Sequence, residues 1–423
     1  MINEVAEALT PTATATATGR LERFMATTFC YLPTGSGLTK LNDYRVSKRP
    51  YRRFETLSCF SCNPQKVFPR REVEVRRQWQ HCGQAFVNNK SDYYSNTTIH
   101  QEEDKEADIS KATLTWRAIK LPIYSVALIP LTVGSAAAYL QTGMFSAQRY
   151  SILLISSVLI ITWLNLSNDV YDFDTGADIN KKESVVNLVG SRTGTLVSAY
   201  LLLALGFLGL AWVSVKAGSM RAILLLGCAV TCGYIYQCPP FRLSYKGLGE
   251  PLCFAAFGPF ATTGFYLLQG STREVIHLPF TGSILSLSLL VGITTALILF
   301  CSHFHQIEGD RAVGKISPLV RLGTERGSGV VKWAVTGLYV LTFTFGLSSA
   351  LPFTCIFLCC LTLPIARLVV SYVEENHNDK QKIFMAKYYC VRLHSLFGTA
   401  LAAGLVVSRM FPKLSLSSTF GLS

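Results

Sequence analysis

Apolar runs separated by short polar segments dominate this chain from about residue 111 onward. About nine of these runs reach roughly 20 residues, the length that a helix needs to cross a bilayer. They lie near 119–140, 150–168, 194–214, 220–238, 249–269, 281–303, 330–350, 352–372 and 392–409. The pattern predicts an all-α integral membrane protein with about nine transmembrane helices, occupying residues 111–423.

The first 110 residues have a different pattern. They contain no apolar run of membrane length, a Thr/Ala repeat from Thr12 to Thr18, and basic pairs such as Arg52-Arg53. This composition is typical of a plastid transit peptide followed by a disordered region, and Met25 opens a segment that reads as a second possible start. Several glutamates in the region depart from that composition, so a disordered cytosolic tail is the alternative.

The charge distribution orients the predicted bundle. Hydrophobic residues make up 50% of the chain, charged residues 15%, and the formal net charge is +13. Most lysines and arginines outside the N-terminal region fall in loops on one side of the predicted spans, which is the positive-inside pattern. This placement indicates a lipid bilayer as partner and argues against nucleic acid, which a net positive charge alone could have suggested.

A first acidic and amide-rich cluster stands at the end of the second apolar run. Its members are Asn165, Asn168, Asp169, Asp172, Asp174 and Asp178. Residues 165, 168 and 172 have the i, i+3, i+7 spacing of one helix face. Asp174 and Asp178 are expected in the following loop, where Gly176 allows a turn. Carboxylates beside hydrocarbon are costly and usually functional, although an exposed acidic loop that holds a helix end among the headgroups is the alternative.

A second cluster follows the sixth run and repeats the spacing. It comprises His303, Gln306, Glu308 and Asp310, with 303, 306 and 310 again at i, i+3, i+7. Four crossings separate the two clusters, so both are expected on the same, basic side of the membrane. Two facing sets of oxygen ligands predict a site for Mg²⁺ that holds a strongly anionic substrate. Glu308 would lie about 200° round a helix from Gln306, away from the others.

The two clusters resemble the paired aspartate-rich motifs of the UbiA superfamily of intramembrane prenyltransferases. The segment from Asn168 to Asp178 resembles the first motif. The segment from Cys301 to Gly323 resembles the second motif of the branch that prenylates 1,4-dihydroxy-2-naphthoate, with His303 and Gln306 where that branch commonly has Asn and Asp. Trp116–Pro122 and Tyr234–Glu250 extend the resemblance over roughly residues 113–410.

The resemblance implies roles for individual residues. Asp172, Asp310 and Lys315 would be catalytic. The Mg²⁺–diphosphate ligands would be Asn168, Asp169, Asp172, Asp178 and Asp310. The cations that bind the diphosphate would be Lys181, Arg192, Lys315 and Arg321. Asn165, His303, Gln306 and Glu308 would contact the aromatic acceptor or a second metal site.

The same resemblance implies a fold and a reaction. The helices would surround a central cavity in which a prenyl group passes from its diphosphate to 1,4-dihydroxy-2-naphthoate with loss of CO₂. Together with a plastid address, it implies phytyl diphosphate as donor, phylloquinone (vitamin K1) biosynthesis as the pathway, and a multi-pass protein of the chloroplast inner envelope or thylakoid. Two alternatives stay open at this point: another acceptor such as homogentisate, and a cation or proton transporter, because intramembrane carboxylates also mark ion paths.

Overall fold

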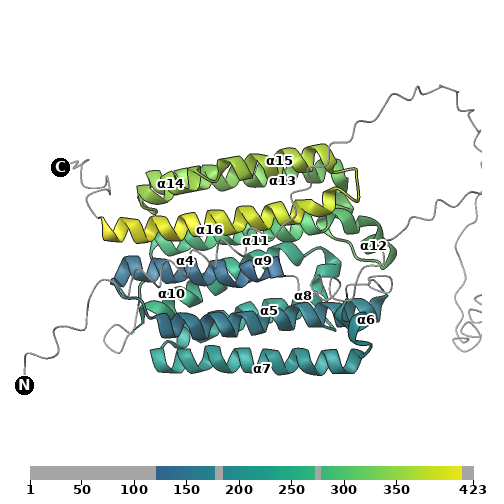
Figure 1. Cartoon of the computed structure of the whole chain (residues 1–423), viewed down its shortest axis with the longest axis horizontal. Helices are drawn as coiled ribbons and strands as arrows, with labels where there is room; N and C mark the ends of the chain where they lie inside the picture. Colours follow the sequence, from purple (N-terminus) through teal and green to yellow (C-terminus); the bar gives the residue numbers. More distant parts are fainter. Residues whose placement is uncertain (1–120, 177–183, 272–277, 412–423) are drawn as a thin grey trace, which may run out of the picture. The chain divides into compact units, whose positions relative to one another are not determined.

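The computed structural model describes residues 121–176, 184–271 and 278–411, which belong to one compact unit, Glu103–Ser423. Throughout these ranges the regular structure is helical, and the long helices lie side by side along a common direction (Figure 1). Eight of the helices in these ranges are long and apolar enough to cross a membrane, or nine if one bent pair counts as a single span. The predicted all-α membrane bundle is therefore confirmed.

The first half of the bundle runs from η1 to α8. Its elements are η1 (Leu121–Tyr124), α4 (Ser125–Thr142), α5 (Ala147–Thr175), α6 (Val185–Val189), α7 (Arg192–Ala217) and α8 (Met220–Gln237). Two of these helices begin at a serine whose side chain accepts a backbone N–H: Ser146 accepts from Arg149 and Ser191 accepts from Gly194. Such caps satisfy donors that the helix itself leaves unpaired.

The second half runs from η2 to α16. Its elements are η2 (Leu243–Lys246), α9 (Gly249–Ala255), the π-helical η3 (Ala256–Thr262), α10 (Thr263–Gly270), α11 (Gly282–Ser302), η4 (Phe304–Gln306), α12 (Ile307–Ala312), α13 (Pro318–Leu347), α14 (Phe353–Cys360), α15 (Leu363–Asn376), η5 (Ile383–Met385) and α16 (Ala386–Met410). α9, η3 and α10 form one continuous span, in which the wider η3 turn accommodates Pro259, a residue without a backbone donor.

Close helix packing holds the bundle together, within each half and between the halves. α5 packs along α7, while α16 packs against α4, α11 and α14. A Cβ atom added at Gly206 would lie 2.8 Å from the Ser156 carbonyl oxygen, so the glycine lets α7 approach the backbone of α5. Small residues at such crossings are the usual means of close packing in a bilayer, where apolar burial between helices provides little driving force.

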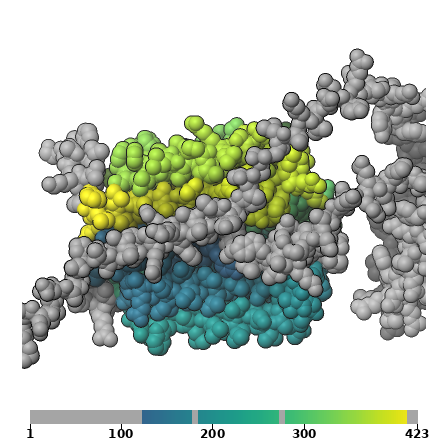
Figure 2. Space-filling view, viewed as in Figure 1, coloured from purple at the N-terminus to yellow at the C-terminus, as the bar shows by residue number. Residues whose placement is uncertain are grey.

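The outward surfaces of the bundle are apolar, as expected for contact with lipid. Large exposed side chains on these surfaces include Ile155, Val197, Leu208, Trp212, Trp333 and Phe357. In Figure 2 the segments around α5 and α7 (blue to teal) and around α14 to α16 (yellow-green) form opposite margins of the face in view.

The ends of several helices differ from the predicted runs. α13 starts at Pro318 instead of near 330, because polar turns continue the helix beyond the apolar stretch. Gly323, at φ 78° and ψ 169°, interrupts the helical backbone within these turns. The predicted run 352–372 divides into two helices, α14 and α15, and the chain bends by 49° between them. α5 continues to Thr175, beyond the apolar run that ended near 168, and ends at Gly176, which adopts φ 81°.

Candidate active site

Asp172, in the last turns of α5, is a centre of hydrogen bonding at one end of the bundle. Its Oδ1 accepts from the Gln237 amide at the end of α8 and, at 3.4 Å, from the Tyr245 hydroxyl. The Ser244 hydroxyl donates in turn to the side-chain amide oxygen of Gln237, Oε1, at 3.0 Å. Gln237 and Ser244 are almost fully buried, so this chain fixes one face of the Asp172 carboxylate.

The loop that carries Tyr245 connects this carboxylate to the second half of the chain. The Ile316 amide donates to the Tyr245 carbonyl oxygen at 2.8 Å, and the Arg321 guanidinium donates to the Lys246 carbonyl oxygen at 2.8 Å. The Lys315 ammonium lies 6.0 Å from the centre of the Tyr245 ring. Burial raises the pKa of Tyr245 to about 12, so its hydroxyl stays protonated and can donate to Asp172 at neutral pH.

The second motif does not form one continuous helix, contrary to the expected single face for 303, 306 and 310. α11 ends at Ser302, His303 caps it, a 3₁₀ turn covers Phe304–Gln306, and α12 starts at Ile307. His303 Nδ1 lies 3.0 Å from Glu250 Oε1 of α9.

Asp310 is buried and faces a lysine. Its Oδ1 lies 3.2 Å from Lys315 Nζ, with Asp310 and Lys315 both largely shielded from solvent. Its Oδ2 is buried and has no hydrogen-bond partner among the described residues. A buried carboxylate oxygen without a donor is costly unless a ligand completes it.

The two motifs meet around Tyr236, one residue before the end of α8. The charges of Asp172, Glu250 and Asp310 all act on its buried hydroxyl. These carboxylates belong to α5, α9 and α12, which are far apart in the sequence. The end of α5 next to α6 and the short helix α12 lie toward the same end of the bundle (Figure 1).

Two further aspartates of the first motif, Asp169 and Asp174, have local partners. Asp169 is buried and accepts from the Val185 amide at 3.0 Å, which ties α5 to α6. Asp174 belongs to the last turn of α5, and the expectation that it stands in the following loop is wrong. It forms a two-pronged salt bridge with Arg192, at 2.9 and 2.7 Å. Arg192, expected to bind diphosphate, is thus paired with a carboxylate. Asp178 and Lys181 lie outside the described residues.

Other predicted residues are placed away from the buried carboxylates or lack partners. Glu308 is exposed and lies 2.6 Å from Lys380 Nζ. Gln306 is half-buried in the turn before α12. Asn165 Nδ2 and Asn168 Oδ1, on α5, are buried and unpartnered among the described residues. The unpartnered oxygens of Asn168 and Asp310 are the clearest structural sign that this region receives a ligand.

A comparison with known families and proteins identifies the relatives of the chain. The pattern of the "UbiA prenyltransferase family" matches residues 127–391. The chain belongs to this family. It is 67% identical over 311 residues to the chloroplastic 2-carboxy-1,4-naphthoquinone phytyltransferase of Arabidopsis thaliana, with 74% of this chain and 80% of the relative covered.

Two further matches extend this result. The 2-carboxy-1,4-naphthoquinone phytyltransferase of Synechocystis sp. is 45% identical over 288 residues, which cover 68% of this chain and 91% of the relative. The solved apo structure of a UbiA homolog from Aeropyrum pernix K1 matches with a TM-score of 0.53 at 16% identity, over 69% of this chain and 98% of the other. This structural match shows a shared fold.

The donor atoms in this region of the UbiA fold suit Mg²⁺. Asn168 and Asp310 each present a buried, unpartnered oxygen, and hard oxygen ligands are those that Mg²⁺ prefers. No group of three His, Cys, Asp or Glu side chains among the described residues is arranged to hold a metal ion. Mg²⁺ is usually held by one or two carboxylates together with substrate phosphate oxygens and water.

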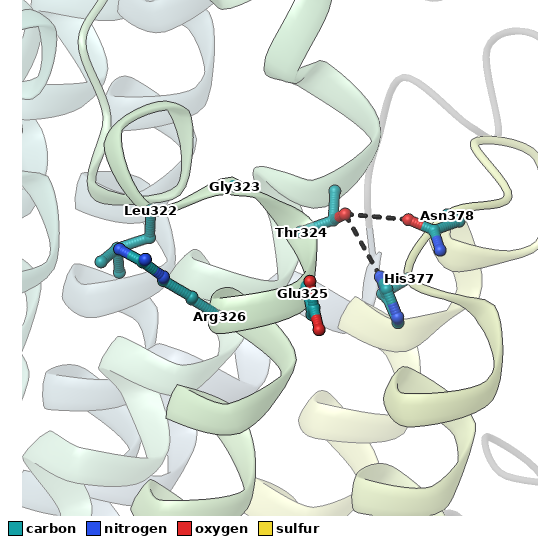
Figure 3. A pocket seen from close by; sticks show the side chains of 7 residues that line it. All are labelled: Leu322, Gly323, Thr324, Glu325, Arg326, His377 and Asn378. Atoms are coloured by element: carbon teal, nitrogen blue, oxygen red, sulfur yellow. Dashed lines mark hydrogen bonds between the residues drawn. The ribbon is translucent and has the colours of Figure 1, made fainter.

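A separate hollow of about 680 Å³ lies between the start of α13 and the end of α15 (Figure 3). Thr324 donates to Asn378 at 3.0 Å and lies 3.2 Å from His377 Nδ1 across it. Its lining residues are Leu322, Gly323, Thr324, Glu325, Arg326, His377 and Asn378. None of these residues belongs to the set of buried carboxylates, so the hollow is not assigned to the candidate site.

Sequence reasoning missed Gln237, Tyr245 and Glu250 as parts of the site. All three lie in the segment Tyr234–Glu250, which extended the resemblance without receiving a role. A polar Gln at the end of an apolar run and a Glu at the start of the next were visible signals. Their partners were not, because pairing with Asp172 and His303 depends on how distant helices pack.

Proposed function

We propose that this protein transfers a phytyl group from phytyl diphosphate to 1,4-dihydroxy-2-naphthoate with loss of CO₂, a step of phylloquinone biosynthesis. The observation that carries the proposal is the 67% identity to a chloroplastic 2-carboxy-1,4-naphthoquinone phytyltransferase. The set of buried carboxylates at one end of the bundle agrees with a diphosphate substrate.

The oxidation level of the acceptor follows from the chemistry. The named acceptor of the relatives is a naphthoquinone, whose ring is electron-poor. The ring carbon must attack an allylic carbon that becomes cationic as the diphosphate leaves, and this requires electron density. The quinol, 1,4-dihydroxy-2-naphthoate, is the two-electron-reduced form of the same skeleton and is the competent nucleophile.

The residues assigned to the metal are Asn168, Asp169, Asp172, Asp178 and Asp310. Mg²⁺ bound there supplies charge neutralisation for the leaving diphosphate. Asp172 is held for this role by Gln237 and Tyr245, so its carboxylate stays fixed when the substrate arrives.

The residues assigned to the diphosphate are Lys181, Arg192, Lys315 and Arg321. Lys315 is the best supported, because its ammonium already lies beside Asp310. Arg192 would have to exchange its Asp174 partner for phosphate oxygens. Arg321 can donate both to the Lys246 carbonyl and to a phosphate, since a guanidinium carries five N–H donors.

The bond changes in this reaction balance without an added reductant or base. The C1–O bond of the donor breaks and diphosphate leaves with the electron pair. The ring carbon that bears the carboxylate forms the new C–C bond. Its bond to the carboxylate then breaks, CO₂ leaves, and that electron pair restores the aromatic ring. Site residues must therefore stabilise the leaving group and hold the acceptor ring within reach of C1.

The proposed location is a chloroplast membrane, either the inner envelope or the thylakoid. Support comes from the membrane-crossing helices and from the chloroplastic relative. Residues 1–110 would then include the transit peptide.

The test is incubation of the purified protein in liposomes with Mg²⁺, phytyl diphosphate and 1,4-dihydroxy-2-naphthoate, followed by mass spectrometry of the lipid product. We expect 2-phytyl-1,4-naphthoquinol and equimolar CO₂. Homogentisate and geranylgeranyl diphosphate are added as competitors in parallel. Preferential prenylation of homogentisate would show that homogentisate is the acceptor. A Mg²⁺-independent ion flux without any prenylated product would show that the protein is a transporter and not a prenyltransferase.

A further inference from the structure

Glu250 and His303 form a buried acid–imidazole pair, in which Glu250 has no assigned role and His303 has only the alternatives of an acceptor contact or a second metal site. Glu250 is the second residue of α9, and His303 stands at the end of α11. Their side chains are 12% and 4% exposed, and His303 Nδ1 lies 3.0 Å from Glu250 Oε1. Glu250 Oε2 is buried without a hydrogen-bond partner among the described residues.

The pair lies within the region of buried carboxylates. Gly249, the residue before Glu250, packs against Tyr236 near the end of α8, since a Cβ atom added at Gly249 would lie 3.0 Å from Tyr236 Cε2. Packing of the two helices does not require this pair, because α11 and the π-helical turn after α9 already touch through backbone. A Cβ atom added at Gly258 would lie 2.5 Å from the Ser288 carbonyl oxygen. A buried carboxylate with an unpartnered oxygen therefore calls for another explanation.

The arrangement defines the imidazole tautomer. A carboxylate at Nδ1 places the ring proton on that nitrogen and leaves the lone pair on Nε2. Nε2 makes no hydrogen bond within the described ranges of the chain, so it can accept a proton from a ligand. A carboxylate that orients and polarises an imidazole in this way is the arrangement found in general bases.

We propose that Glu250 and His303 form the acceptor subsite, in which His303 Nε2 takes the proton of the hydroxyl group ortho to the carboxylate of a hydroxynaphthoate. The inference rests on the proposed function and adds the residues that activate its acceptor. Glu250 is a positioning residue, because it acts through the imidazole.

The proton balance supports this choice of hydroxyl. When the carboxylate-bearing ring carbon forms its bond to the prenyl carbon, the ortho oxygen becomes a ketone and its proton moves to Nε2. The product of that step is a β-keto carboxylate. Loss of CO₂ from it leaves an enolate, which takes the same proton back from Nε2 and becomes the naphthol. No proton is gained or lost overall, so the base needs no contact with bulk water.

Electrostatics favour the charged state that this step creates. The imidazolium would stand beside the carboxylate of Glu250, 3.0 Å from Nδ1. An opposite charge at short range stabilises the protonated ring while the new C–C bond forms. The hydroxyl at the 4-position cannot serve in this way, since it is meta to the carbon that attacks.

The test compares His303→Asn and Glu250→Gln with two matched controls outside the site. His377→Asn removes a half-buried imidazole beside Thr324, and Glu374→Gln removes an exposed carboxylate paired with Lys332. Wild-type transfer to 1,4-dihydroxy-2-naphthoate is measured first, because its absence would refute the proposed function and the subsite together. For His303→Asn we expect kcat to fall by about 10²- to 10⁴-fold, with the KM for phytyl diphosphate within about twofold of wild type.

A second acceptor separates a base from a merely structural histidine. An analogue with an electron-withdrawing group on the distal ring has a more acidic 1-hydroxyl and depends less on a base. The deficit of His303→Asn should shrink by about tenfold or more with this analogue. Glu250→Gln is a second measurement, which keeps the inference testable if His303→Asn fails to fold. It keeps an acceptor for Nδ1 but loses the charge, so it should reduce kcat by about tenfold.

Three results would overturn the inference while leaving the proposed function intact. These are a kcat of His303→Asn within about threefold of wild type, an equal deficit with both acceptors, and a parallel loss of phytyl diphosphate affinity. The controls His377→Asn and Glu374→Gln should retain wild-type kinetics with either acceptor.

Discussion

Replacing Gln237 with leucine isolates the hydrogen bond that holds Asp172. Leucine has a similar volume and keeps the site filled, but it cannot donate to Asp172 Oδ1 or accept from Ser244. Gln237 is 3% exposed, so water cannot easily replace the lost donor. The Tyr245 hydroxyl, at 3.4 Å from Asp172 Oδ1, is a longer contact than the one that is lost.

The magnitude follows from the charge on the acceptor. A hydrogen bond to a charged group contributes about 1.5–3 kcal/mol, and each 1.4 kcal/mol is a factor of ten. If this free energy serves to hold Asp172 in position for the metal-bound diphosphate, kcat/KM for phytyl diphosphate should fall by about 10- to 150-fold. The Mg²⁺ concentration for half-maximal activity should rise, because a less fixed ligand binds more weakly.

The assay is the initial rate of prenyl transfer in liposomes, titrated with Mg²⁺ and with donor, beside thermal unfolding of the detergent-solubilised protein. Ser244→Ala is the matched control, since it breaks the bond to Gln237 and leaves the bond to Asp172 intact. We expect it to cost less than about fivefold, the equivalent of one neutral hydrogen bond. A Gln237→Leu protein with wild-type rate and unchanged Mg²⁺ requirement would refute the idea that this bond prepares the site.

Three further predictions concern the site and the N-terminal region. Asp172→Ala or Asp310→Ala should abolish prenyl transfer without preventing insertion or folding, and near-normal turnover in either variant would remove the carboxylate–metal assignment. A chain lacking 1–110 should remain active in detergent or liposomes, as measured by product formation; inactivity in a folded protein would show that this segment contributes to the site. Lys315→Ala should raise the KM for phytyl diphosphate more than Glu308→Ala, and a strong shift of the Mg²⁺ requirement in the Glu308 variant alone would instead make Glu308 a metal ligand.

Much of the membrane fold was predictable from the sequence, because each span satisfies its own backbone hydrogen bonds and shows its length directly as an apolar run. Helix ends were less predictable where polar residues continue a helix beyond the hydrocarbon. α5 extends to Thr175 and α13 begins at Pro318 for this reason. The bend between α14 and α15 leaves no mark in hydropathy alone.

The candidate site was predictable as two motifs on one side of the membrane, but its internal pairing was not. Spacing predicted a shared face for Asn165, Asn168 and Asp172, which the continuous α5 provides. The same spacing failed for 303, 306 and 310, because a 3₁₀ turn interrupts the helix and changes the angle per residue. The partnership of His303 with Glu250 arises only from the packing of α11 on α9.

The contacts of the Tyr245 loop also imply that the site is completed late during synthesis of the chain. Ribosomes deliver α5 and α8 long before Ile316 and Arg321, whose contacts hold the backbone of this loop. A nascent chain that has inserted its first four spans thus displays Asp172 and Gln237 but lacks the residues that fasten Tyr245 over them. Affinity for a prenyl diphosphate should arise late in synthesis, when the start of α13 has emerged.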